Sequence, residues 1–137
     1  PSLVYGPEDT RQSYGPSGFA RSIISQGSVT LWGDGSELRD FIFVEDIAEL
    51  TRMLAFSDTP GPYNLVSGKT HSFMEIVESF QPVYEPGFQI RSRDRTKHKV
   101  DQGYDNAKLL AAFPDFSPTD FDEGMKKTFL RVLSTHK

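Results

Sequence analysis

Arg39 is the residue whose surroundings most clearly predict a fixed position and a chemical role. It lies in the β-rich run of residues 38–43, and Asp34-Gly35 is a turn signal between this run and the β-rich run before it. This spacing predicts a β-hairpin that holds Arg39 on a short, rigid strand. A guanidinium fixed in this way can donate two parallel hydrogen bonds to a phosphate. The segment therefore predicts an anion-binding site, with a surface salt bridge to Glu37 or Asp40 as the alternative.

Basic side chains also occupy every second position of residues 91–99. They are Arg91, Arg93, Arg95, Lys97 and Lys99. On an extended segment this alternation would place them on one face. The plain interpretation is a solvated edge strand, whose charge discourages pairing with another chain. The functional alternative is a free-standing, non-catalytic binding module that uses this basic face for RNA or another polyanion.

Other chemistry finds little support in the sequence. His71, His98 and His136 lack the spacing of a metal site. Gly15-Pro16-Ser17-Gly18 misses the Gly-x-Ser-x-Gly nucleophile elbow by one residue. The chain has no cysteine, which excludes disulfides and fits a reducing cytoplasm. We therefore expect no metal site and a cytoplasmic location.

The composition is typical of a globular domain. Of the 137 residues 36% are hydrophobic and 12% aromatic, which is enough for a core but short for a two-domain enzyme. The net charge of −4 makes nucleic acid a poor first guess as a partner, because the field of the whole molecule repels phosphate polymers. No apolar run approaches the ~20 residues that span a bilayer, so no membrane association is expected.

Hydrophobic patterns predict alternating strands and helices, which indicates an α/β fold. Strands are expected at residues 3–5, 29–32, 38–43, 63–66 and 88–91. Helical stripes are expected at residues 19–26, 44–54, 73–80 and 121–133, with a shorter helix that starts at Asp105 as its N-cap. Gly27 suits the left-handed position after a helix, and Ser72-x-x-Glu75 is a capping box.

Residues 33–46 resemble a motif of the extended short-chain dehydrogenase/reductase family, which contains the NAD-dependent nucleotide-sugar epimerases and dehydratases. In that family a Gly-Asp-Gly turn is followed by Arg-Asp-aromatic-hydrophobic-x-Val-x-Asp, and this segment fits the pattern nearly throughout. Further segments are similar to other family motifs. They are Leu3-Val4-Tyr5-Gly6-Pro7, Pro62-Tyr63-Asn64-Leu65, Asp105-Asn106-Ala107-Lys108 and Asp120-Phe121-Asp122-Glu123-Gly124. The resemblance covers almost the whole chain, but only the C-terminal half of a family member.

The resemblance implies a site for a nucleotide-sugar of the UDP- or dTDP-sugar class. It implies that Arg39 and Arg95 contact the diphosphate and that Thr30 and Trp32 lie along the base, with Trp32 as an ordinary core residue as the alternative. In such enzymes NAD or NADP oxidises the sugar and returns the hydride. Lys97-His98 replaces the family's Gly-Asp, so a carboxylate that relatives aim at the ribose is lost and positive charge is gained.

Two family features are absent from the sequence: a Gly-rich turn that binds the dinucleotide pyrophosphate at a helix N-terminus, and a catalytic Tyr-x-x-x-Lys pair. Tyr104 and Lys108 have the latter spacing, but they follow the substrate arginines instead of preceding them. The chain also starts at Pro1 without methionine. We therefore expect residues 1–137 to be a C-terminal substrate-binding fragment of a Rossmann-type fold. Its N-terminal dinucleotide-binding domain would be absent, and the fragment would have no catalytic residue, no cofactor and no activity of its own.

A fragment of this kind should associate with itself. Residues 3–5 and 63–66 resemble strands of a parallel sheet whose other strands would lie in the absent half. Such strands are normally covered on both faces and paired on both sides. Left open, they offer a template for pairing with another chain, so a homo-oligomer is expected.

Overall fold

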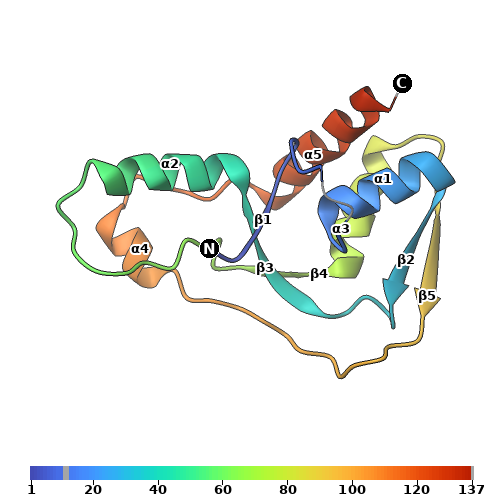
Figure 1. The fold of residues 1–137 in the computed structure, drawn as a ribbon, viewed down its shortest axis with the longest axis horizontal. Coiled ribbons are helices and arrows are strands. Elements are labelled where there is room, and N and C mark those ends of the chain that lie inside the picture. Colours follow the sequence, from blue (N-terminus) through green and yellow to red (C-terminus); the bar gives the residue numbers. More distant parts are fainter. Residues whose placement is uncertain (11–12, 137) are drawn as a thin grey trace.

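The computed structural model describes residues 1–10 and 13–136, which form an α/β fold with helices on both sides of its strands (Figure 1). The elements in chain order are β1 (Leu3–Tyr5), α1 (Pro16–Gln26), β2 (Ser28–Trp32), β3 (Leu38–Phe43), α2 (Val44–Ala55), β4 (Thr70–Ser72), α3 (Phe73–Phe80), the short 3-10 helix η1 (Gln81–Val83), β5 (Gln89–Arg93), α4 (Ala107–Ala112) and α5 (Phe121–Thr135). The α/β class expected from the hydrophobic patterns is confirmed.

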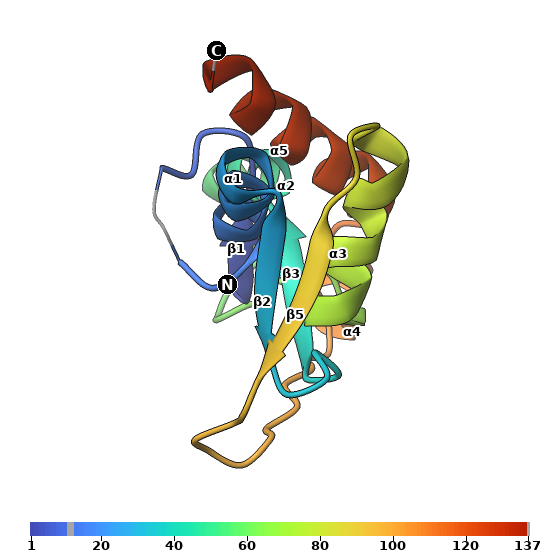
Figure 2. The ribbon, with the colours of Figure 1, turned by 90° about the vertical axis from the view of Figure 1, so that its right-hand side faces the viewer.

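The five strands form two separate sheets. One has the order β1-β3-β4, with β1 parallel and β4 antiparallel to β3. The other contains β2 and β5, which run parallel and lie side by side in Figure 2. The predicted hairpin of β2 and β3 is therefore wrong: the Asp34-Gly35 turn connects the two strands, but each strand pairs elsewhere.

Long-range contacts explain why the hairpin does not form. The carbonyl of Gly35 accepts the N–H of Met74 at 3.0 Å, which attaches the turn to the start of α3. Beyond the turn, Arg39 pairs with His71 of β4 on one side and bridges Gln102 on the other. At Arg39, both edges of β3 therefore already have a neighbouring segment, so β2 cannot pair with β3 there.

Two hydrophobic cores lie on opposite faces of β1 and β3. The helical core, under α1, α3 and α5, contains Tyr5, Phe41 and Phe43 from these strands. The α2 core, under α2 and α4, contains Ile42 and is bordered by Val4. This division follows from the strand period of two, which sends successive side chains to opposite faces.

The segment at residues 63–66 is not a strand, contrary to the sequence prediction. It lies beside β1, with one backbone hydrogen bond from the Ser2 N–H to the Leu65 carbonyl at 3.2 Å. The chain then turns away at Ser67 and Gly68, whose N–H groups donate to the Asp40 carboxylate at 3.0 and 2.8 Å. The side chain of Asp40 therefore accepts hydrogen bonds from N–H groups that a neighbouring strand could otherwise use.

Most helix ends follow their local signals. Gly27 ends α1 in the left-handed conformation with φ 65°, and Ser72 and Glu75 form the predicted capping box of α3. The predicted N-cap of α4 is wrong by one residue. The cap position is Asn106, whose side chain donates to the Ser67 carbonyl at 2.9 Å, while Asp105 accepts the Ala107 N–H from just outside the helix.

Candidate anion-binding site

Arg39 and Arg95, 56 positions apart in the sequence, meet at one carboxylate. Nη2 of Arg39 pairs with Oε1 of Glu37, and Nη2 of Arg95 pairs with Oε2 of the same side chain. The exposed fractions of the three side chains are 16% for Arg39, 13% for Glu37 and 24% for Arg95. The structure therefore brings together the two arginines that the sequence analysis selected. It also contains the predicted alternative, a salt bridge between Arg39 and Glu37.

Main-chain carbonyls fix the guanidinium of Arg39. Its Nη1 donates to the carbonyl of Leu38 at 2.9 Å and to the carbonyl of Val100. Asp101 holds the same segment in place, because its carboxylate accepts the Leu38 N–H at 2.9 Å and pairs with Lys99 at 3.2 Å. These contacts, the Leu38 hydrogen bond first, hold the pKa of Asp101 below its usual range. Arg39 is therefore held in one orientation, as its strand position predicts.

Arg95 reaches the cluster across the turn that follows β2. Gly33 has φ 59°, and a Cβ at this position would lie 3.0 Å from Cδ of Arg95, so a larger residue would meet the arginine stem. Nε of Arg95 is buried and has no hydrogen-bond partner within residues 1–10 and 13–136. Such a donor normally has a partner, which makes it a candidate contact for a ligand or water.

Trp32 and Thr30 lie on the neighbouring β2–β5 ribbon. Trp32 pairs in register with Arg93, whose guanidinium lies 3.9 Å from the centre of the indole ring, and Thr30 pairs with Arg91. Trp32 is only half-buried and is not a member of either core, so its interpretation as an ordinary core residue is wrong. A cation over an indole ring is a favourable contact.

Tyr14 connects the loop before α1 to this ribbon. Its hydroxyl accepts the Trp32 N–H at 2.8 Å, and its ring packs on Phe19 and Phe73. Burial raises the pKa of Tyr14, so the phenol stays protonated at neutral pH. No local signal in the sequence predicts this role of Tyr14, because nothing local connects it to a strand 18 residues away.

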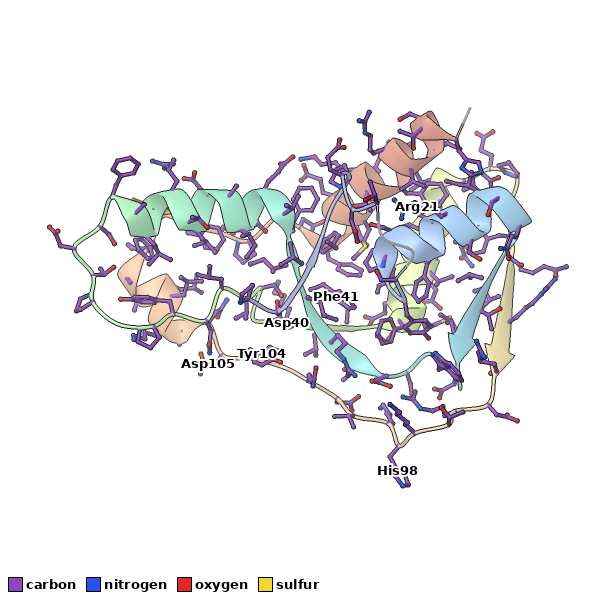
Figure 3. All side chains as sticks on the ribbon, viewed as in Figure 1. Arg21, Asp40, Phe41, His98, Tyr104 and Asp105 are labelled. Carbon is purple, nitrogen blue, oxygen red and sulfur yellow. The ribbon has the colours of Figure 1, made fainter. Side chains whose placement is uncertain are left out.

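The basic segment of residues 91–99 is exposed except at Arg95. Its first three residues, 91–93, belong to β5, an edge of the two-stranded sheet, in agreement with the plain interpretation of a charged edge strand. His98 lies at the tip of the following loop and points away from the fold (Figure 3). Tyr104 and Asp105 are on the far end of that connection, before α4 (Figure 3). Lys108 donates to the Pro62 carbonyl at 2.8 Å.

A groove of about 1370 Å³ opens elsewhere on the molecule. Its lining includes Ser67, His71, Glu75, Asp120 and Lys126, but neither Arg39 nor Arg95. Its charges are mixed, and His71 is engaged by a stack on Phe121 at 3.7 Å between ring centres. We place the candidate site at the arginines, because two fixed guanidinium groups converge there.

The part of the chain that the structure describes has neither a cluster of metal ligands nor a helix suited to a membrane. No group of three or more His, Cys, Asp or Glu side chains there could hold a metal ion. None of the helices in that part has the length and apolar character needed to cross a bilayer.

Comparison with known proteins supports the family that the motifs resemble. Residues 1–65 match the model of the NAD dependent epimerase/dehydratase family. UDP-glucuronic acid decarboxylase 4 of Arabidopsis thaliana is 29% identical over 97 residues, which are 69% of this chain and 22% of that protein. ADP-L-glycero-D-manno-heptose-6-epimerase of Fusobacterium nucleatum is 29% identical over 86 residues, or 53% of this chain and 25% of that protein. The chain thus spans about a quarter or less of these curated relatives.

Solved structures share the fold over nearly the whole chain. The UDP-N-acetylglucosamine 4-epimerase from Methanobrevibacter ruminantium M1, in complex with UDP-N-acetylmuramic acid, has a TM-score of 0.84 and 26% identity. The similarity covers 98% of this chain and 44% of that one. A UDP-glucuronic acid 4-epimerase from Bacillus cereus, in complex with UDP-glucuronic acid and NAD, has a TM-score of 0.85 and covers the same shares at 14% identity. At this identity the second comparison shows the fold alone.

Proposed function

We propose that residues 1–137 are the C-terminal, substrate-binding portion of a nucleotide-sugar epimerase or dehydratase, and that they bind the nucleotide diphosphate of the sugar substrate. The solved epimerase chains extend well beyond the similarity, which covers 44% of each. The 26% identical epimerase contains a UDP-sugar ligand, which supports a nucleotide-sugar of the UDP or dTDP class as partner.

The observation that carries the proposal is the convergence of Arg39 and Arg95 on one carboxylate. Two guanidinium groups that share one anionic partner match the two linked phosphoryl groups of a diphosphate, because each can donate to one of them. Thr30 and Trp32 lie on the ribbon that leads into the Gly33 turn under Arg95, where they can contact the base. Remote binding of this kind positions the sugar for reacting groups elsewhere.

The described residues do not fit a nicotinamide dinucleotide. A pyrophosphate site requires an open helix N-terminus after a strand. Helix α2 follows β3 directly, but its first turn carries Glu45 and Asp46, which would repel phosphate. At the start of α1 the Ser13 carbonyl would lie 1.9 Å from a Cβ on Gly18, so this end is covered. NAD or NADP is therefore assigned to other parts of a complete enzyme, and calorimetry with NADH should detect no binding to this chain.

Calorimetry with UDP and dTDP on the 137-residue chain tests the proposal. Arg39→Ala and Arg95→Ala should each weaken binding by about 10- to 100-fold, the usual scale for hydrogen bonds to a charged group. Arg39→Lys should recover only part of the loss, because the second hydrogen bond is missing. Arg52→Ala is the matched control, since Arg52 is exposed on α2 and pairs only locally with Glu49.

The same titrations distinguish the rival function, a polyanion-binding module. That function would require the exposed β5 and the loop after it, and it predicts a steep loss of affinity for RNA with added salt. RNA binding that depends on Arg91 and Lys97, together with UDP binding that ignores Arg39 and Arg95, would overturn our proposal in favour of the rival.

A further inference from the structure

The carboxylate of Glu37 occupies the place where the two arginines of the site converge. One oxygen faces Arg39, the other faces Arg95, and the Glu37 side chain is only 13% exposed. Glu37 lies directly before β3, two residues ahead of Arg39, and its carboxylate contacts both guanidinium groups. This internal anion makes the contacts that an external phosphate would make.

The N–H groups of Arg39 that do not face Glu37 have little capacity to bind a second anion. Nη1 is committed to the carbonyls of Leu38 and Val100, so Nη2, which faces Glu37, is the freer part of the guanidinium. Arg95 also directs Nη2 to Glu37, while its buried Nε has no partner in the described part of the chain. An incoming diphosphate must therefore separate Glu37 from at least one arginine before it can use both.

We infer that Glu37 is a built-in competitor of the nucleotide, which holds Arg39 and Arg95 together in the empty site and is displaced when a diphosphate binds. This inference rests on the proposed nucleotide-binding function. Two guanidinium groups that converge on one carboxylate would repel each other without an anion between them, and Glu37 removes that cost in the free protein. Its displacement lowers affinity, and it lowers the affinity for a diphosphate, which can contact both arginines, more than the affinity for a monophosphate, which contacts one.

The Glu37→Gln variant tests this competition. Glutamine keeps the size and an acceptor oxygen but loses the charge, so the ligand no longer has to break two ion pairs. We expect UDP to bind about tenfold more tightly than to the parent chain, and UMP about threefold, as befits two and one partly exposed ion pairs. Glu49→Gln on α2, which removes an exposed pair with Arg52, should change neither affinity.

The outcomes separate this inference from the proposed function. If Arg39→Ala weakens UDP binding while Glu37→Gln fails to strengthen it, or strengthens UDP and UMP equally, the competition is refuted and the nucleotide site stands. If Arg39→Ala and Arg95→Ala leave UDP binding unchanged, the nucleotide site itself is refuted.

A structure of the parent chain with UDP gives a second test that does not depend on the folding of a variant. We expect the Glu37 carboxylate to have left at least one of its two arginines, with a phosphate oxygen in its place. A bound UDP beside intact Glu37–Arg39 and Glu37–Arg95 pairs would overturn the inference.

Discussion

The helical core and the α2 core pack on opposite faces of β1 and β3, yet the chain buries them to different degrees. Of the described residues, fifteen are buried in the helical core and six more are partly buried against it. The α2 core has five buried residues and eight partly buried ones. At the two ends of α2, Val44 and Phe56 are 40% and 85% exposed. One core is therefore completed by this chain, and the other is left open.

The two cores therefore have different structural roles. The candidate site lies on the side of the helical core, where α1, α3 and α5 support the β2–β5 ribbon and the turn at Gly35 (Figure 2). A rigid support suits residues that must hold a ligand in one geometry. The α2 core is the region where a further structural element or a second copy could bury apolar surface.

Shortening one buried isoleucine in each core should change the free energy of unfolding most, and it tests the comparison of the two cores directly. Ile76 of the helical core and Ile42 of the α2 core are both fully buried. Ile76→Ala should lower the free energy of unfolding by about 4 kcal/mol and Ile42→Ala by about 2.5 kcal/mol, because partly open surroundings can collapse into the cavity. Urea denaturation followed by circular dichroism measures both. Equal losses would show that the α2 core is as well packed as the other.

Loss of the Asp40 carboxylate should produce the next largest change in the free energy of unfolding. The carboxylate is buried on β3 and accepts hydrogen bonds from the Ser2 hydroxyl at 2.7 Å and from the N–H groups of Ser67 and Gly68. Asp40→Ala leaves these donors unpaired and should cost about 2–3 kcal/mol of unfolding free energy. Asp58→Ala, at an exposed position after α2, is the control and should stay within about 0.5 kcal/mol of the parent. A similar loss in both variants would show that the Asp40 contacts contribute nothing specific.

Self-association should reveal the open side of the α2 core. We expect a dimer or larger assembly at high protein concentration, and Phe56→Ser should weaken it severalfold, because it removes exposed apolar surface at the end of α2. Leu130→Ser, at a 43% exposed position on α5, should leave the association unchanged. Light scattering over a dilution series is the measurement. A parent chain that stays monomeric at every concentration would contradict this expectation.

Removal of the Glu75 carboxylate from the capping box of α3 should give the smallest effect. It should change how the free energy of unfolding depends on pH. Glu75 accepts the Ser72 N–H at 2.6 Å, and this hydrogen bond is the main reason that the pKa of Glu75 lies below its ordinary value of 4.5. Because the pKa is lower in the folded than in the unfolded chain, the stabilisation is fully present above pH 4.5 and is lost as the pH falls through the folded-state pKa. Denaturation at about pH 6 and about pH 3 should therefore show a smaller loss for Glu75→Gln than for the parent chain. Glu78→Gln, on the same helix, should behave like the parent.

Several features of the candidate site could be expected from sequence because they depend on near neighbours. Arg39 is on a strand, and the family motif selected both it and Arg95. Glu37 was foreseen only as a local partner of Arg39, since its second contact, with Arg95, depends on how the chain returns after β5. The role of Asp40 was missed for the same reason, because its partners are 27 and more residues away.

The sequence by itself determined the elements whose cause is local. The period of apolar residues defines α2, α3 and α5, the left-handed glycine ends α1, and the Ser72–Glu75 pair begins α3. Only the tertiary structure decided which strands pair. The turn at Gly33 and Gly35 is compatible with a hairpin, yet β2 joins β5 and β3 joins β1 and β4. Backbone hydrogen-bonding groups are the same in every strand, so their partners are selected by the packing of distant helices and not by the residues of the turn.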